Sequence, residues 1–104
     1  MLNQVIMVGR VQNLQKEFKD GKEILNLHLI IPRALKNSEG IYENDIITIE
    51  LFDNIAKNTE NYIVINDLIG VKGKLANLNG LEGTKIIAER VTFLSSKGGV
   101  NNDN

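Results

Sequence analysis

The sequence has no cysteine, no tryptophan, one histidine and one proline among its 104 residues. Without cysteine, disulfide bonds, thiolate metal sites and cysteine nucleophiles are excluded. The single histidine, His28, rules out a cluster of histidine metal ligands. No apolar run approaches the ~18 residues of a membrane helix, and the opening MLNQVIMVGR lacks the basic region and apolar core of a signal peptide. We therefore expect a soluble, cytoplasmic protein that carries no metal or cofactor.

The formal net charge is −1 at pH 7, so the overall charge does not indicate a nucleic-acid-binding protein. The charges are nevertheless unevenly distributed. Residues 1–36 carry six basic and three acidic groups, residues 37–67 carry one and seven, and residues 68–104 carry five and three. If the fold brings the two basic ends of the chain together, one basic face forms. The alternative is a set of scattered, solvated charges.

The length corresponds to about one domain. Alternating apolar residues predict five strands, at residues 2–11, 22–31, 46–52, 68–75 and 84–94. Asp20-Gly21 and Asn79-Gly80 are typical of hairpin turns, and Pro32 is predicted to end the second strand. The polar segment 32–45 is predicted to be a loop or a flexible hairpin tip. The domain is expected to span residues 1–94, and the polar segment 95–104 to be a short disordered tail.

A short helix is predicted near residues 54–65, because Ile55, Tyr62 and Ile63 form a single apolar stripe at helical spacing. Asp53 or Asn54 is expected to cap its start, and Asn66 to end it in the left-handed conformation. Three strands, one helix and two further strands is the element order of an OB-fold barrel. We therefore predict an all-β, five-stranded OB barrel with one helix between the third and fourth strands. Another small β-barrel or an open α+β sheet is the alternative.

The first strand is apolar on both faces, with Val5 and Met7 on one and Ile6 and Val8 on the other. A strand that is apolar on both faces is buried on both, so a partner subunit is a natural cover for one side. We expect an oligomer, most simply a tetramer built from twofold dimers, with a dimer as the alternative. Its isologous contact should bury either Val5 and Met7 or Ile6 and Val8.

No arrangement typical of catalysis stands out in the sequence. No Ser/His/Asp set and no pair of carboxylates occurs at a spacing that is typical of catalytic residues. The segment GVKGK at residues 70–74 lacks the spacing of a phosphate-binding loop. We expect a binding protein rather than an enzyme.

Three segments resemble the bacterial single-stranded DNA-binding protein family. The family's first strand commonly contains Asn, Val and a closing Val-Gly-Arg/Asn, and it resembles the opening segment MLNQVIMVGRV. Residues 47–75 resemble the family's third strand, helix and fourth strand. The last strand of the family resembles the segment KIIAERVTFL. The three occur in the family's order over residues 1–94. The resemblance implies an OB barrel whose oligomers coat single-stranded DNA, without strong sequence preference, during replication, recombination or repair.

The resemblance also implies a basic groove for phosphates and aromatic faces on which bases stack. Phe52 matches the aromatic residue that ends the third strand, and Arg10 the residue that closes the first. Lys72 and Lys74 flank the glycine of the fourth strand. Arg33 and Lys36 lie in the loop after the second strand, which in the family grips DNA; Tyr42 of the same loop matches no motif position and is added from its residue type and place. The candidate DNA-binding residues are thus Arg10, Arg33, Lys36, Tyr42, Phe52, Lys72 and Lys74.

Each candidate also has an ordinary structural interpretation. Phe52 can belong to the core, Tyr42 can anchor its loop, Arg10 can pair with a carboxylate, and the strand lysines can be solvated. Tyr62 and Phe93 are predicted to lie in the core, which leaves few aromatic residues to stack. Lys57 is interpreted as part of a solvated helix face.

The sequence departs from the family in several places. Ile46 stands where many members have a stacking tryptophan, and the hairpin 76–84 lacks their basic and aromatic residues. The tail lacks the acidic Pro-Phe segment that recruits partners in the family, so we expect no recruitment of proteins through it. Two alternatives stay open: an OB-fold primosomal or phage/mobile-element accessory protein, and an OB-fold protein-interaction module without DNA function.

Overall fold

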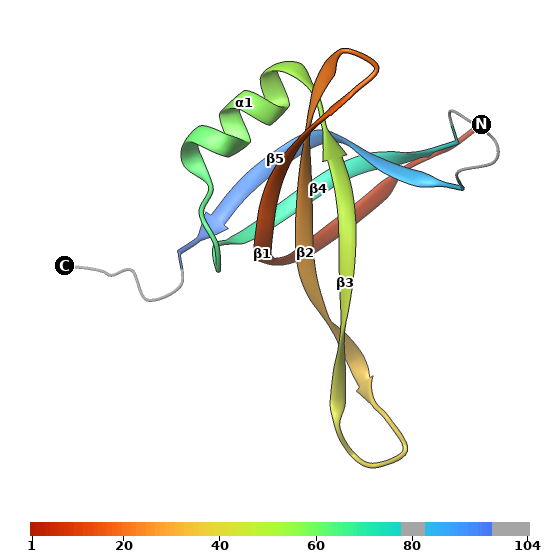
Figure 1. The fold of residues 1–104 in the computed structure, drawn as a ribbon. Helices are drawn as coiled ribbons and strands as arrows, with labels where there is room; N and C mark the ends of the chain where they lie inside the picture. Colours follow the sequence, from red (N-terminus) through yellow and green to blue (C-terminus); the bar gives the residue numbers. More distant parts are fainter. Residues whose placement is uncertain (78–82, 97–104) are drawn as a thin grey trace.

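Five strands close into a barrel in the order β1-β2-β3-β5-β4, with one helix between β3 and β4 (Figure 1). The computed structural model describes residues 1–77 and 83–96. Its elements are β1 (Val5–Lys19), β2 (Lys22–Lys36), β3 (Tyr42–Leu51), α1 (Asp53–Tyr62), β4 (Leu68–Ala76) and β5 (Lys85–Ser95). The predicted five-stranded barrel and the place of its helix are confirmed. The expected turn at Asn79-Gly80 and the tail from residue 97 onward lie outside the described residues.

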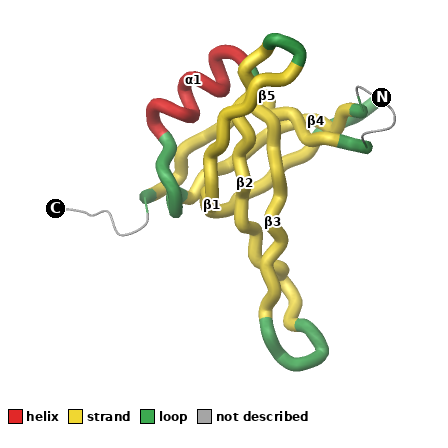
Figure 2. The backbone as a smooth tube through the Cα atoms, viewed as in Figure 1, coloured by secondary structure: helices red, strands yellow, loops and turns green. Residues whose placement is uncertain are grey.

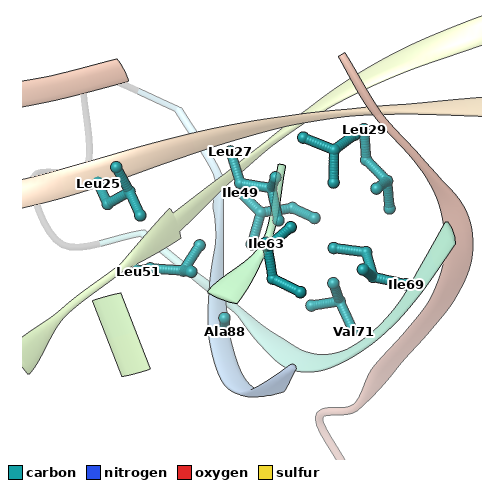
Figure 3. Close-up of a cluster of buried hydrophobic side chains, with 10 residues drawn as sticks. Leu25, Leu27, Leu29, Ile49, Leu51, Ile63, Ile69, Val71 and Ala88 are labelled. Carbon is teal, nitrogen blue, oxygen red and sulfur yellow. The ribbon is translucent and has the colours of Figure 1, made fainter. Parts of the chain in front are cut away.

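The described core is aliphatic. Alternate residues of β2 face the barrel interior, where they meet side chains of the other strands and of Ile63 after the helix (Figure 3). The core cluster consists of Val11, Leu25, Leu27, Leu29, Ile49, Leu51, Ile63, Ile69, Val71 and Ala88. The alternation predicted for the second strand is therefore confirmed. Leu75, also expected to face inward, is largely exposed because it lies near the end of β4.

The two aromatic residues predicted to lie in the core are outside it. Tyr62 is 77% exposed, because Ile63 takes the buried position at the end of the helix. Phe93 is 50% exposed; it pairs with Ile69 near the end of β5, where the barrel covers it incompletely. Since Phe18 and Tyr42 are also exposed, the chain leaves more aromatic surface available than the sequence indicated.

β1 is shared between two neighbours. It pairs with β4 through Val5–Arg10 and with β2 through Arg10–Lys19. The strand passes from one partner to the other at Arg10, and at the preceding Gly9 an added Cβ would lie 2.5 Å from the carbonyl oxygen of Ile30. The prediction ended this strand too early, because the second half of β1 is mostly polar and exposed although it pairs with buried residues of β2 such as Leu25 and Leu27. Asp20 and Gly21 both have positive φ and form the predicted two-residue turn of that hairpin.

The β2–β3 hairpin extends beyond the barrel as a long arm (Figure 2). Most of the segment predicted as a loop is paired strand, and β2 continues past Pro32 with an irregular register before Lys36 pairs with Tyr42. Only the tip is a turn. There the side-chain Oδ1 of Asn37 accepts hydrogen bonds from the backbone N–H groups of Glu39 and Ile41. We call residues 32–45 the arm.

Helix α1 packs against β2 and β5 through an apolar stripe that includes Ile55, Ala56 and Ile63. The predicted cap is wrong: the N-cap residue is Phe52, and it makes no side-chain capping hydrogen bond. Asp53 instead lies in the first turn, where its negative charge complements the helix dipole. Asn66 has the expected positive φ, but it lies in the loop after the helix, which ends at Tyr62.

Candidate nucleic-acid interface

The predicted DNA-binding residues occupy three parts of the molecule (Figure 1). Phe52 lies at the start of α1. Arg10, Lys72 and Lys74 belong to β1 and β4, and the remaining three, Arg33, Lys36 and Tyr42, lie on the arm. One copy of the chain therefore does not gather them into a single site. A strand of DNA that touches all of them has to run along the surface of the barrel.

Phe52 lines a pocket of about 190 Å³ between the β1–β2 hairpin and α1. Leu25 and Ala56 supply the other apolar lining. Three lysines, Lys16, Lys22 and Lys57, also line it, together with Glu23, Asp53 and Glu60. Phe52 is half-buried rather than part of the core cluster, so its ring belongs to a pocket wall. An aromatic wall beside cationic side chains suits a base and its phosphate.

The sequence did not single out the lysines of this pocket. They come from β1, from β2 and from α1, and only the fold brings them together. Lys57 was assigned to a solvated helix face. Lys16 lies 2.7 Å from the Glu60 carboxylate, and that hydrogen bond raises the pKa of Lys16. A phosphate approaching Lys16 has to replace this carboxylate, so Lys22 and Lys57 are the better candidates for phosphate contact.

Lys72 and Lys74 are exposed on the outer face of β4. Lys72 pairs in register with Arg90 of β5 and with Ile6 of β1. Arg90, which the sequence analysis did not select, thus adds a third cation to this face. Together the three form a basic strip over the β4–β5 ladder.

Arg10 has a structural role. Its Nη1 donates a hydrogen bond of 2.9 Å to the carbonyl oxygen of Asn66, in the loop after the helix. The backbone of Val11 is tied to the same loop, since it donates to the Asp67 carbonyl and accepts from the Asn66 N–H. Arg10 therefore helps to hold that loop against β1. Its remaining guanidinium N–H groups are the part that a phosphate can contact.

On the arm, Arg33 is held by two carboxylates. Its Nε and Nη2 donate to Asp45, the shortest contact being 2.9 Å, and its Nη1 donates to Glu43 at 3.2 Å. The hydrogen bond from Arg33 lowers the pKa of the Asp45 carboxyl. Lys36 Nζ lies 5.5 Å from the centre of the Tyr42 ring, within the range of a cation–π interaction. The arm thus presents one aromatic residue and one arginine already paired with acids.

The sequence matches the model of the "Single-strand binding protein family" over residues 2–94. The chain belongs to this family. Similar relatives include the single-stranded DNA-binding proteins of Oceanobacillus iheyensis, 30% identical over 94% of this chain, and of Bacillus cereus, 32% identical over 95%. The chain spans 66% and 64% of the length of these two proteins. The resemblance of the three sequence segments is therefore confirmed.

Solved structures of single-strand binding proteins share the fold. Rim1, a mitochondrial single-stranded DNA-binding protein of S. cerevisiae, superposes with a TM-score of 0.73 at 13% identity, over 91% of this chain and 96% of that one. A Plasmodium falciparum SSB solved as a complex with single-stranded DNA gives 0.69 at 20% identity, over 91% and 97%. These comparisons support the OB barrel.

Membership of the single-strand binding family agrees with the expectation that the chain is not an enzyme. Within residues 1–77 and 83–96, no group of three or more His, Asp or Glu side chains is placed to hold a metal ion. In the same described part of the chain, no helix is long and apolar enough to cross a membrane.

Proposed function

We propose that this chain binds single-stranded DNA without strong sequence preference, and protects and extends it during replication, recombination or repair. The family match over residues 2–94 carries the proposal, because it spans nearly the whole barrel. Its relatives are bacterial proteins named for single-stranded DNA binding, and bacterial DNA lies in the cytoplasm, so the proposal places the chain there.

The geometry supports a mode of binding in two parts. Bases stack on Phe52 in its pocket and on Tyr42 of the arm, since aromatic faces accept any base. Phosphates meet the cations around these rings and along the basic strip. The basic contacts predicted from the sequence are Arg10, Arg33, Lys36, Lys72 and Lys74. We add Lys22 and Lys57, which line the Phe52 pocket, and Arg90, which pairs with Lys72.

Titration of the full chain with oligo-dT at a low and a high salt concentration tests this proposal. We expect binding at low salt. The logarithm of the affinity should fall linearly with the logarithm of the salt concentration, with a slope of about 0.7 per neutralised phosphate. No binding at low salt would refute the proposal and favour a protein-interaction module. The mass of the oligomer in solution then helps to distinguish a tetrameric DNA-coating protein from a dimeric accessory protein.

We also infer that the chain assembles as a homo-oligomer, most simply a tetramer, through the first half of β1. In the described chain, Val5 to Gly9 pair on one side only, with β4, which leaves the other strand edge open. Ile6 and Val8 are 68% and 51% exposed beside this edge, whereas Met7 packs against the core. An open apolar edge is prone to pairing, and a twofold contact with β1 of a second copy covers it.

Of the two contacts predicted from the sequence, these exposures favour the one through Ile6 and Val8. The double variant Ile6→Asp/Val8→Asp is expected to lower the particle mass measured by light scattering at micromolar concentration, because two buried charges repel at the contact. Gln15→Asp, an exposed position on the same strand, is the control and should keep the wild-type mass. A monomeric wild type, or an unchanged mass in the double variant, would contradict the proposed contact.

Release of Arg33 should strengthen DNA binding. Asp45→Asn removes the main partner of the guanidinium, and we expect oligo-dT affinity to rise about threefold at low salt and less at high salt, since the gain is electrostatic. Arg33 lowers the pKa of Asp45, so about pH 6 and about pH 8 both lie well above the range in which this carboxyl titrates. The wild-type carboxylate is charged at both, and the gain in affinity should therefore be equal at both.

Glu39→Gln removes the same charge from the arm and is the matched control for Asp45→Asn. The backbone N–H of Glu39 donates a hydrogen bond to the side chain of Asn37, which Glu39→Gln leaves in place. An equal gain from Glu39→Gln would show that net charge, and not the freed Arg33, controls the affinity.

A further inference from the structure

The outer face of β1, β2 and β3 carries a polar groove of about 370 Å³ that none of the sites above uses. Its lining comes from four strands or their ends and includes Glu17, Asn26, His28, Thr48, Glu50 and Lys85. OB folds bind nucleic acids across this part of the barrel. Among the described residues, no Phe, Tyr or Trp side chain lines the groove.

The side chains of the groove are held in place. Asn26 and His28 of β2 pair in register with Glu50 and Thr48 of β3. Asn26 Nδ2 donates a hydrogen bond of 2.8 Å to Glu17 Oε1. Glu50 is only 7% exposed, and its Oε2 lies 3.5 Å from Lys85 Nζ. The groove therefore offers fixed hydrogen-bonding groups to the edge of a base.

The charges of the groove determine which part of a DNA strand can enter it. Two carboxylates, Glu17 and Glu50, face one ammonium group, Lys85, so phosphate is disfavoured there. A strand that crosses this face has to turn its bases inward. Carboxylates only accept hydrogen bonds, and among the pyrimidines cytosine offers an exocyclic amino group where thymine has a carbonyl oxygen.

We propose that this groove binds base edges through hydrogen bonds and favours cytosine over thymine. Glu17 is the main selecting residue: Asn26 occupies its Oε1, and the other carboxylate oxygen accepts from the cytosine amino group. The inference rests on the proposed binding of single-stranded DNA and adds a moderate base preference to it.

Competition between oligo-dC and oligo-dT of equal length, at about pH 8, tests the preference. We expect the wild-type chain to bind oligo-dC about fivefold more tightly, the low end for one good base contact. In Glu17→Gln the amide oxygen still accepts from Asn26, which turns the amide NH₂ toward the base. This exchanges an acceptor for a donor, so the ratio should fall to about one or reverse in favour of thymine.

Glu89→Gln is the matched control, because it removes one exposed carboxylate of β5 outside the groove. It is expected to change both affinities equally and to keep the cytosine preference. Equal wild-type affinities for the two oligonucleotides, or a ratio that Glu17→Gln leaves unchanged, would overturn the inference. Failure to bind either oligonucleotide at low salt would instead overturn the proposed function, and the inference with it.

Discussion

Phe52→Ala is expected to weaken binding to oligo-dT by about tenfold at every salt concentration, since stacking is worth about 1–3 kcal/mol per base. The substitution removes the aromatic wall of the pocket but no charge. The dependence of log affinity on log salt should therefore keep its slope. Titrations at several salt concentrations measure both quantities, and a thermal melt checks that the variant is folded.

Phe93→Ala is the control, because Phe93 is also partly exposed but lies on β5, outside the pocket. The lysines should behave in the opposite way: Lys22→Gln, Lys57→Gln, Lys72→Gln and Lys74→Gln should each flatten the salt slope by about 0.7 where a phosphate contact is lost. If Phe52→Ala leaves the affinity unchanged while the lysine variants abolish binding, stacking is not part of the mechanism.

Gly9→Ala is expected to destabilise the barrel strongly. The new Cβ would lie 2.5 Å from the carbonyl oxygen of Ile30 and 3.0 Å from side chains of Leu29 and Ile31. The oxygen belongs to the backbone, so the strand itself has to shift next to Arg10, the residue at which β1 passes from β4 to β2. Overpacking of this kind costs about 1–3 kcal/mol. At about 4–8 °C per kcal/mol for a small domain, the melting temperature should fall by at least several degrees.

Gly70→Ala is the matched control on β4. An added Cβ there would meet nothing nearer than 3.9 Å, so we expect a melting temperature close to that of the wild type. Thermal melts followed by circular dichroism measure the melting temperatures of the wild type, Gly9→Ala and Gly70→Ala. A wild-type melting temperature for Gly9→Ala, or an equal loss for Gly70→Ala, would show that close backbone approach at Gly9 is not limiting.

The barrel itself could be predicted from the sequence, because burial enforces the alternation of residues such as Leu25, Leu27 and Leu29. The projecting halves of the hairpins could not. The end of β1 is itself mostly polar and exposed although its partner β2 is buried, and the strands of the arm are exposed on both sides, so neither segment has an apolar pattern. Their residues have the composition of loops although their backbones form ladders.

Candidate site residues could be predicted from the sequence only where a single residue is recognisable by its own type or by its match to the family. Phe52 and Lys72 were chosen as candidates from residue type and family resemblance, and they stay predictions. The pocket around Phe52 was not found, because Lys22 and Lys57 reach it from different elements and neither has a distinctive sequence neighbourhood. Tyr62 was misplaced because it stands beside the apolar stripe of α1, and the stripe alone does not say whether Tyr62 or Ile63 is buried.

The ladder between β3 and β5 consists of two register pairs, Ile49 with Ile86 and Glu50 with Ile87. Ladders between strands adjacent in the chain, β1–β2, β2–β3 and β4–β5, are much longer. Pairs close in sequence form at a lower cost in chain entropy than distant ones. We therefore expect a three-stranded meander and a two-stranded hairpin to form early. The barrel then closes last, through β1–β4 and the short β3–β5 ladder, and this closure sets the folding rate.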